Sequence, residues 1–254
     1  MKNTNLFLDY LVFIKKPSNE RFNSMNIKSR IISFIFIFIL TFIVVWIASF
    51  PYSILANLKI IPVVENLSYN KILDYKIRND NNFNIYIFVH LFFSILFFIV
   101  MYILPITKYN FNRFIISISM ILSVLILPFF DEKLSLISDN YIYHTLVYSS
   151  LTIASSVIFF YFFKSLLKRK LVNFEEKWNN NYNRIFYIYV ILMTITTIFS
   201  YNINIQNVFS VILILLPSFV CNVSFGYTRI RIGIVESILL ISLFNLIYFI
   251  PFLI

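Results

Sequence analysis

Glu236 is the side chain in this sequence whose type and position best suit acid–base chemistry. It lies inside a long apolar run, residues 232–252, where an ionisable group costs about 2.5–3.5 kcal/mol to place in a membrane. A carboxylate there could carry a proton or face a substrate. It could instead pair with Arg229 or Arg231, which precede it by one or two helical turns. We favour the ion pair and keep these residues as candidate functional groups, together with Asn245 further along the same run.

The two histidines do not form a recognisable metal site. His90 and His144 fall near the outer ends of their expected helices, and the chain has no His-x-x-x-His or Glu-x-x-His spacing. The single cysteine, Cys221, sits in an apolar run, which is typical of a small buried side chain. We therefore expect structural histidines, no metal, no cofactor and no disulfide.

Hydroxyl groups are frequent in the apolar runs, but they lack the partners that would make them nucleophiles. Ser and Thr side chains in such helices commonly bond to their own backbone or to a neighbouring helix. No serine has a histidine or lysine expected at the same depth of a membrane. A mechanism with a serine nucleophile is therefore disfavoured.

The elements that must position these groups are apolar helices. The chain has 254 residues, of which 60% are hydrophobic and 13% charged, whereas soluble domains average about 25% charged residues. Long apolar runs recur along the whole chain, which indicates a polytopic α-helical membrane protein. The presence of only two glycines and the lack of short alternating segments disfavour a β-barrel.

We predict an all-α bundle of about seven transmembrane helices within residues 31–254, with no soluble domain and no internal repeat. The expected spans are about 31–50, 85–106, 114–130, 142–163, 185–200, 208–225 and 232–252. The third and fifth spans are shorter than the roughly 20 residues that a helix needs to cross a bilayer, so their ends are the hardest to place.

The distribution of basic residues predicts the orientation of the bundle. Sixteen of the 21 Lys and Arg residues fall on the side of the N-terminus and five on the other side. Because positive charge accumulates in cytoplasmic loops, we expect a cytoplasmic N-terminus and a C-terminus outside. The same loops account for the net charge of +10, so nucleic-acid binding is not indicated. No cleavable signal peptide is visible, and we expect the inner membrane of a bacterial cell.

Two flanking segments are expected at the membrane surfaces. Residues 1–30 form a basic cytoplasmic segment, in which residues 5–16 place Leu6, Tyr10, Phe13 and Ile14 on one face of an interfacial helix. The outer segment 51–84 mixes apolar and charged residues. We expect it to lie against the outer leaflet or to cap the bundle, with a re-entrant helix as the alternative.

The last third of the chain carries a family resemblance. The stretch NVFSVILILLPSFVCNVSFGYTRIRIGIVESILLISLFNLIYFIP (207–251) combines a proline-broken helix, a basic turn framed by Gly226 and Gly233, and Asn245-Leu246. It resembles the C-terminal part of the CAAX-protease and bacteriocin-processing family of glutamic intramembrane proteases. The resemblance implies a CAAX-protease-like helical bundle that binds a peptide or lipid in a groove between helices.

The resemblance also implies where catalytic groups would lie, and those positions hold other residues. The glutamates of the first family motif fall on Phe98 and Ile99, and the two catalytic histidines fall on Thr197 and Ser242. Hydroxyl groups cannot act as bases at neutral pH, and Phe and Ile cannot hold a proton. We therefore expect no catalytic residues and a proteolytically inactive relative of this family.

Three functions remain open from the sequence. The first is a membrane-embedded binding or scaffold subunit whose partner is another membrane protein, or a peptide or lipid in the groove. The second is an active intramembrane protease with a rearranged site that uses Glu236. The third is a small-molecule permease, which scarce glycine and few polar groups in the apolar runs disfavour.

Overall fold

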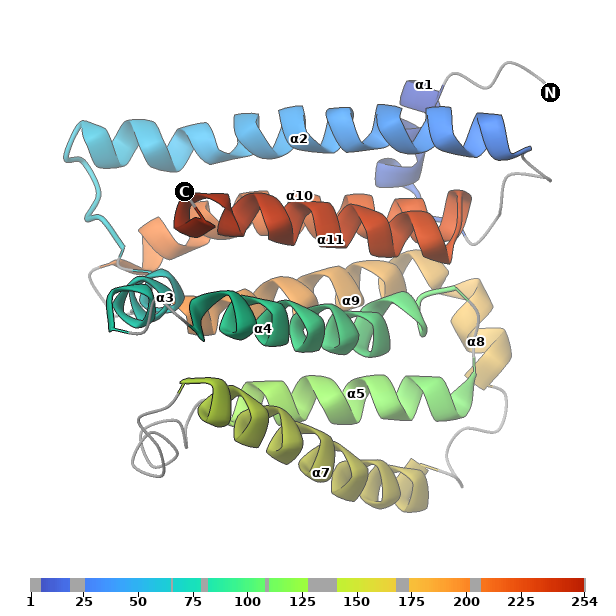
Figure 1. Cartoon of the computed structure of the whole chain (residues 1–254). Coiled ribbons are helices and arrows are strands. Elements are labelled where there is room, and N and C mark those ends of the chain that lie inside the picture. The colour runs from blue at the N-terminus through green and yellow to red at the C-terminus, as the bar shows by residue number, and fades with distance from the viewer. Residues whose placement is uncertain are drawn as a thin grey trace.

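The protein is a bundle of packed α-helices (Figure 1). A computed structural model describes residues 6–18, 26–64, 66–78, 82–107, 110–127, 141–167, 174–201 and 207–253. Outside the described residues lie parts of the predicted segments 1–30, 51–84 and 114–130. The prediction of an all-α bundle is confirmed.

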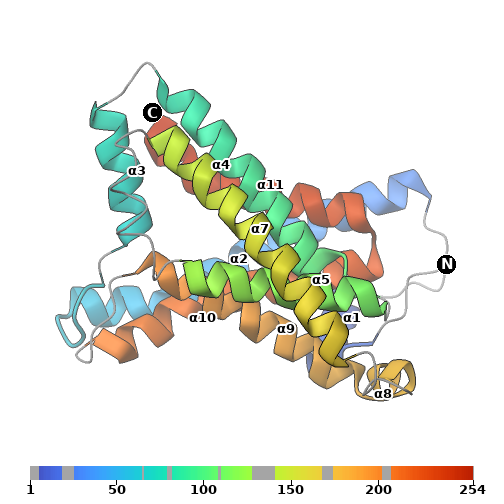
Figure 2. The same ribbon diagram turned by 90° about the horizontal axis from the view of Figure 1, so that it is seen from below.

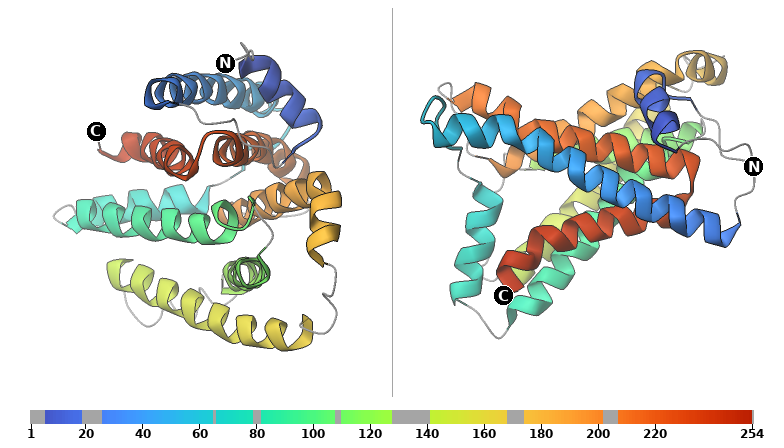
Figure 3. Two further views of the ribbon diagram at one scale, coloured as in Figure 1. Left: turned by 90° about the vertical axis from the view of Figure 1, so that its right-hand side faces the viewer. Right: turned by 90° about the horizontal axis from the view of Figure 1, so that it is seen from above.

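The helices lie in stacked layers, with α2 on one side of the molecule and α7 on the other (Figures 1 and 3). In chain order the elements are α1 (Leu6–Lys15), α2 (Ile27–Asn57), α3 (Leu67–Arg78), α4 (Phe83–Phe98), the π-helical turn η2 (Ile99–Ile103), α5 (Phe111–Ile126), α7 (Tyr141–Leu167), α8 (Phe174–Asn180), α9 (Tyr182–Thr196), the 3₁₀ turn η4 (Thr197–Ser200), α10 (Val208–Arg231) and α11 (Ile234–Leu253). Consecutive long helices run in opposite directions (Figure 1).

Over the residues that the structure describes, a helix lies within each of the seven ranges predicted as spans. Within the described residues, four helices are long and apolar enough to cross a membrane by length and composition: Ile27–Asn57, Phe83–Ile103, Ile142–Leu167 and Val208–Arg231. Two shorter apolar helices cover Phe111–Ile126 and Ile234–Ile250. The fold therefore fits a membrane protein.

Helix α10 is the central element, because α2, α9, α11 and both short turns pack against it. Its most extensive neighbour is α2, where Ser33, Ile37 and Thr41 are buried at intervals of four residues. This spacing places the three side chains on one face of the helix. Small and hydroxyl-bearing residues on such a face let two helices approach closely.

Small and hydroxyl-bearing residues also lie in the contact between α5 and α7. Ser119 and Ser123 of α5, and Ser149 and Thr152 of α7, are buried. The hydroxyls of Ser123 and Thr152 each donate to a carbonyl of their own helix at 2.9 Å. The hydroxyls of Ser123 and Thr152 are therefore satisfied without widening the interface between the helices.

The basic turn predicted for residues 226–233 is shorter in the structure, because α10 continues to Arg231. Gly226 is helical, and its absent side chain makes room for neighbours: an added Cβ would lie 2.7 Å from the Phe186 ring and would also collide with the Tyr102 hydroxyl. The chain reverses at Ile232 and Gly233 instead. Gly226 is therefore needed for close packing rather than for a turn.

We call the end where α2 and α11 begin and α10 ends the basic end of the bundle (right in Figure 1). At the opposite end α3 lies beside the ends of α4 and α11 (Figure 2). Tyr75 of α3 is buried and packs its ring 4.8 Å from that of Tyr86. The connection before α3 is held by Ser210, whose hydroxyl donates to the Pro62 carbonyl at 2.9 Å.

Helix α1 is placed differently from a helix that lies only on a membrane. Of the face predicted from the sequence, Tyr10 and Phe13 are buried in the protein, whereas Ile14 is exposed. The Phe13 ring meets those of Phe186 and Tyr227 edge to face at 5.1 Å each. Helix α1 is thus part of the packed core at the basic end.

Candidate functional site

Buried and half-buried charges gather at the basic end of the bundle. We define the arginine site as Asp9 of α1, Arg30 of α2, Arg229 and Arg231 of α10, and Glu236 of α11. The first two and the last two described helices of the chain therefore supply it. Charged groups so poorly exposed to water must be paired or hydrogen-bonded, because desolvation otherwise destabilises them.

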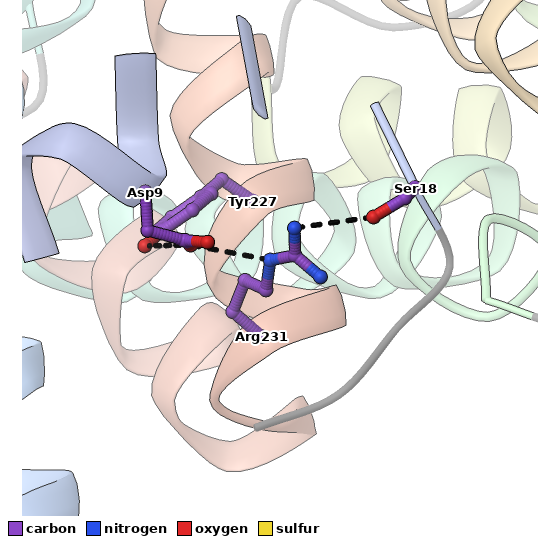
Figure 4. Close-up of polar contacts among 4 residues, drawn as sticks. All are labelled: Asp9, Ser18, Tyr227 and Arg231. Atoms are coloured by element: carbon purple, nitrogen blue, oxygen red, sulfur yellow. Dashed lines mark hydrogen bonds and ion pairs between the residues drawn. The ribbon is translucent and has the colours of Figure 1, made fainter. Parts of the chain in front are cut away.

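Arg231 is held by α1 and by the segment that follows it (Figure 4). Its Nε lies 3.3 Å from Oδ2 of Asp9, and its Nη2 donates to the Ser18 hydroxyl at 3.1 Å. The same Asp9 oxygen accepts a hydrogen bond from the Tyr227 hydroxyl at 2.9 Å. The guanidinium also lies over the Phe13 ring, 5.3 Å from its centre. Asp9 therefore neutralises the charge of Arg231 and ties α1 to the end of α10.

Glu236 forms its ion pair with Arg30. The Arg30 Nη2 atom lies 2.7 Å from Oε1 and 2.9 Å from Oε2 of Glu236. The prediction from the sequence that Glu236 pairs with Arg229 or Arg231 is therefore wrong. Because Glu236 stands in the first turn of α11, its charge is also favoured by the helix dipole.

Gly233 makes room for this pair. A Cβ atom at Gly233 would lie 2.6 Å from Oε2 of Glu236 and 2.9 Å from Nη2 of Arg30. Any other residue would have to displace the ion pair from its position. Gly233, which the sequence placed in a turn, thus also leaves the space that the Arg30–Glu236 ion pair fills.

Arg229 binds the π-helical turn at the end of α4. Its Nε donates to the Ile103 carbonyl at 3.0 Å, and its Nη2 lies 3.5 Å from the Thr107 hydroxyl. A π-helical turn interrupts the regular ladder and leaves carbonyls available for other donors. Just beyond this turn, the Tyr182 hydroxyl donates to the Ile106 carbonyl at 2.7 Å. Arg229 thereby fastens α10 to the chain reversal between α4 and α5.

The positions that the family resemblance assigned to catalytic groups hold packed or self-bonded side chains. The ring of Phe98 meets those of Tyr102 and Phe225 edge to face at 5.4 and 5.5 Å. Ile99 opens η2 and is half-buried. These side chains carry no group that could exchange a proton.

The remaining candidate polar groups are bonded within their own helices. Ser242 donates to the Ile238 carbonyl at 2.8 Å, and Asn245 donates to the Ile241 carbonyl at 3.0 Å. Thr197 donates to a carbonyl three residues earlier at 2.7 Å. Their donors are therefore engaged by the backbone, as is common for short polar side chains in apolar helices.

The histidines lie in aromatic surroundings. The His90 ring is 5.8 Å from the ring of Phe249, and His144 stacks 6.4 Å from Tyr148. Glu236 and Phe249 are thirteen residues apart on α11, about 20 Å along a helix. Glu236 is thus separated from His90 by most of the length of α11. Over the described part of the chain, no three His, Cys, Asp or Glu residues are grouped to hold a metal.

Asp9 and Arg30 belong to the site but were not singled out in the sequence, and Tyr10, which packs beside the site, was expected only on the apolar face of an interfacial helix. The Tyr10 hydroxyl shares a hydrogen bond of 2.7 Å with the Ser224 hydroxyl. Burial raises the pKa of Tyr10 above its ordinary value, so the phenol keeps its proton. One signal could have found this helix: Asp9 is an acid within an apolar stretch, as Glu236 is.

Comparisons with known proteins leave the site to be interpreted from its own geometry. The resemblance to CAAX proteases stays a prediction. A scan against protein-family models, a search of curated proteins and a search of solved structures each found no match to the chain.

Proposed function

We propose that this chain is a seven-span protein of the bacterial inner membrane, with its N-terminus in the cytoplasm and its C-terminus outside. It is a proteolytically silent relative of the CAAX-protease and bacteriocin-processing family. It acts as a binding or scaffold subunit for another membrane protein, or for a peptide or lipid held between its helices.

One observation carries the proposal: Glu236, the acid in the apolar run of α11, is held by Arg30 at 2.7 Å and 2.9 Å. A general base must approach the proton that it removes, whereas this carboxylate is occupied at both oxygens. Ser242 is engaged by its own helix. These contacts favour binding over proton transfer, and they disfavour the alternative of a rearranged protease site that uses Glu236.

Helix α7 offers the most open face to a partner within the membrane. It packs on α4 and α5, while Ile158, Tyr161 and Phe162 on its other side are 69%, 66% and 57% exposed. Aromatic residues dominate many protein–protein contacts, because they bury a large area at a small entropic cost. A transmembrane helix of another protein is a suitable occupant of this face.

The experiment is purification of the tagged chain from its native membrane in a mild detergent, followed by mass spectrometry. A matched variant, Tyr161→Ala with Phe162→Ala, removes two aromatic rings from the exposed face of α7 and leaves the arginine site unchanged. We expect the same membrane protein to accompany the chain in repeated preparations and to be depleted with the variant. Repeated recovery of the chain alone would contradict a scaffold function.

A second measurement tests the alternative that the chain is a protease. Purified chain is incubated with membrane peptides in liposomes beside a Glu236→Gln variant, which keeps the size of the side chain and removes its charge. The proposal expects no cleavage by either protein. Cleavage by the unaltered chain that disappears in the variant would establish a protease using Glu236.

A further inference from the structure

Helix α1 has two apolar faces, and only one of them packs on the protein. Tyr10 and Phe13 are 3% and 0% exposed. They hold the helix to α9 and α10 through edge-to-face contacts with Phe186 and Tyr227 at about 5 Å and through the hydrogen bond to Ser224.

The opposite face of α1 is apolar and open. Leu8, Leu11 and Val12 are 56%, 45% and 61% exposed, and their spacing of three and four residues places them on one side of the helix. Lys15 continues the same side, and Lys16 follows it. A surface helix of a water-soluble bundle would carry polar groups on this side instead.

The contacts of α1 fix its depth along the bundle. It touches α10 at Ser224, Tyr227 and Arg231, which span seven residues, or about 10 Å of helix. At its other end, the Tyr187 hydroxyl of α9 donates to the Ile14 carbonyl. Helix α1 therefore lies alongside the last turns of α10, just inside the level of the arginines. An interfacial helix buries its apolar face to a similar depth, about 5–10 Å into the boundary between headgroups and acyl chains.

Exposed positive charges follow this face among the described residues. Lys15, Lys16 and Lys28 are all exposed, and Asp9, the acid of α1, is paired with Arg231. Exposed lysines beside an embedded apolar face attract anionic headgroups, at about 1 kcal/mol for each basic residue near the surface. The surface thus combines apolar insertion with charge complementarity to an anionic leaflet.

We propose that α1 is a two-sided clamp between the bundle and an anionic lipid leaflet. Tyr10 and Phe13 bind it to α9 and α10, Leu8, Leu11 and Val12 insert between lipid headgroups, and the lysines bind lipid phosphates. This inference rests on the membrane placement in the proposed function, but it does not depend on any protein partner.

The test uses the full chain with Cys221→Ser in nanodiscs, with one cysteine introduced at a time and labelled with an environment-sensitive fluorophore. Val12→Cys reports the open face, and Asn180→Cys, an exposed position of α8 at the same end of the bundle, is the matched control. Quenching by a nitroxide near the top of a lipid acyl chain is compared with quenching by aqueous iodide. Discs of pure phosphatidylcholine are compared with discs that also contain phosphatidylglycerol.

The inference expects the Val12 label to be quenched by the lipid nitroxide and shielded from iodide, with the reverse at position 180. Phosphatidylglycerol should strengthen the lipid quenching at position 12 roughly twofold, and Lys15→Glu with Lys16→Glu should remove that increase. A Val12 label open to iodide would overturn the inference, because the face would then lie in water. A label shielded from both quenchers would also overturn it, because protein would then cover the face. The copurification experiment judges the scaffold function separately from either result.

Discussion

The carboxylate of Asp9 lies 3.3 Å from the guanidinium Nε of Arg231, joining the N-terminal helix to the end of α10 (Figure 4). The side chains of Arg231 and Asp9 are 8% and 19% exposed, so neither charge is well hydrated. Each therefore depends on the other for compensation. The end of α10 is therefore stabilised only while α1 is packed against it.

Replacing Asp9 by asparagine should loosen α1. Asparagine keeps an acceptor for the Tyr227 hydroxyl but leaves the charge of Arg231 without its carboxylate. We expect a loss of about 1.5–3 kcal/mol in unfolding free energy, the usual range for a hydrogen bond to a charged group. Unfolding in mixed micelles measures it, and faster tryptic cleavage after Lys15 reports release of the helix.

The control is the same substitution in an Arg231→Gln background. Since the interaction partner is then absent, Asp9→Asn should cost clearly less than it does alone. Equal costs in the two backgrounds would show that the ion pair contributes nothing and that Asp9 acts through Tyr227 alone.

Glu236→Gln should affect stability but not the binding of a partner. The Arg30 side chain is 38% exposed, so solvent weakens the pair, and we expect a loss of at most about 1 kcal/mol. Arg30→Gln should cost a similar amount, and the double variant should cost less than the sum. A large loss of partner binding with unchanged stability would instead place Glu236 in the functional surface.

Gly226→Ala should be more harmful than Gly233→Ala. The added methyl group at Gly226 meets the buried Phe186 ring and the Tyr102 hydroxyl, whereas at Gly233 it meets the ends of two long side chains that can move. Overpacking of a core typically costs about 1–3 kcal/mol. Thermal unfolding of the two variants side by side measures the difference.

Tyr102→Phe tests the cause of that difference. Alone it removes the hydrogen bond to the Asn222 carbonyl, at 2.8 Å, and should destabilise the protein. Combined with Gly226→Ala it also relieves one of the collisions, so its cost should shrink. Purely additive effects would argue that Gly226 matters for reasons other than contact with Tyr102.

The orientation of the bundle can be tested with cysteines on the Cys221→Ser background. Asn180 in α8 and Asn70 in α3 are exposed and belong to opposite ends of the molecule (Figure 1). In intact cells a membrane-impermeant maleimide should label Asn70→Cys and spare Asn180→Cys until the membrane is opened. Labelling of both positions from outside would contradict the seven-span arrangement.

The apolar runs predicted the positions of the long helices, because such a run consists of consecutive residues and its length follows directly from the sequence. The end of α10 was placed too early, since Gly226 was interpreted as the start of a basic turn. The structure shows that the rings facing it require a glycine within the helix. That requirement comes from Phe186 and Tyr102, which are distant in the sequence.

The candidate site was predicted only in part. Glu236 was singled out because a charge in an apolar run is conspicuous, and Arg229 and Arg231 were named as its expected partners. Their partners could not be deduced, since Asp9 and Arg30 reach the site from the other end of the chain. Helical periodicity likewise identified one apolar face of α1, but that face was expected at the membrane surface, whereas its Tyr10 and Phe13 pack on protein.

The unequal lengths of the helices have a consequence for the surrounding lipid. Helix α2 has 31 residues, about 46 Å at the rise of an α-helix, whereas α5 has 16 residues, about 24 Å. Helix α9 is as short as α5, and the two contact each other. If all seven helices cross one bilayer with a hydrocarbon thickness of about 30 Å, the lipid must thin beside α5 and α9, while α2 must tilt or protrude. The protein would then impose an uneven thickness on its own annulus of lipid, and neighbours with short hydrophobic segments would gather at its thin side.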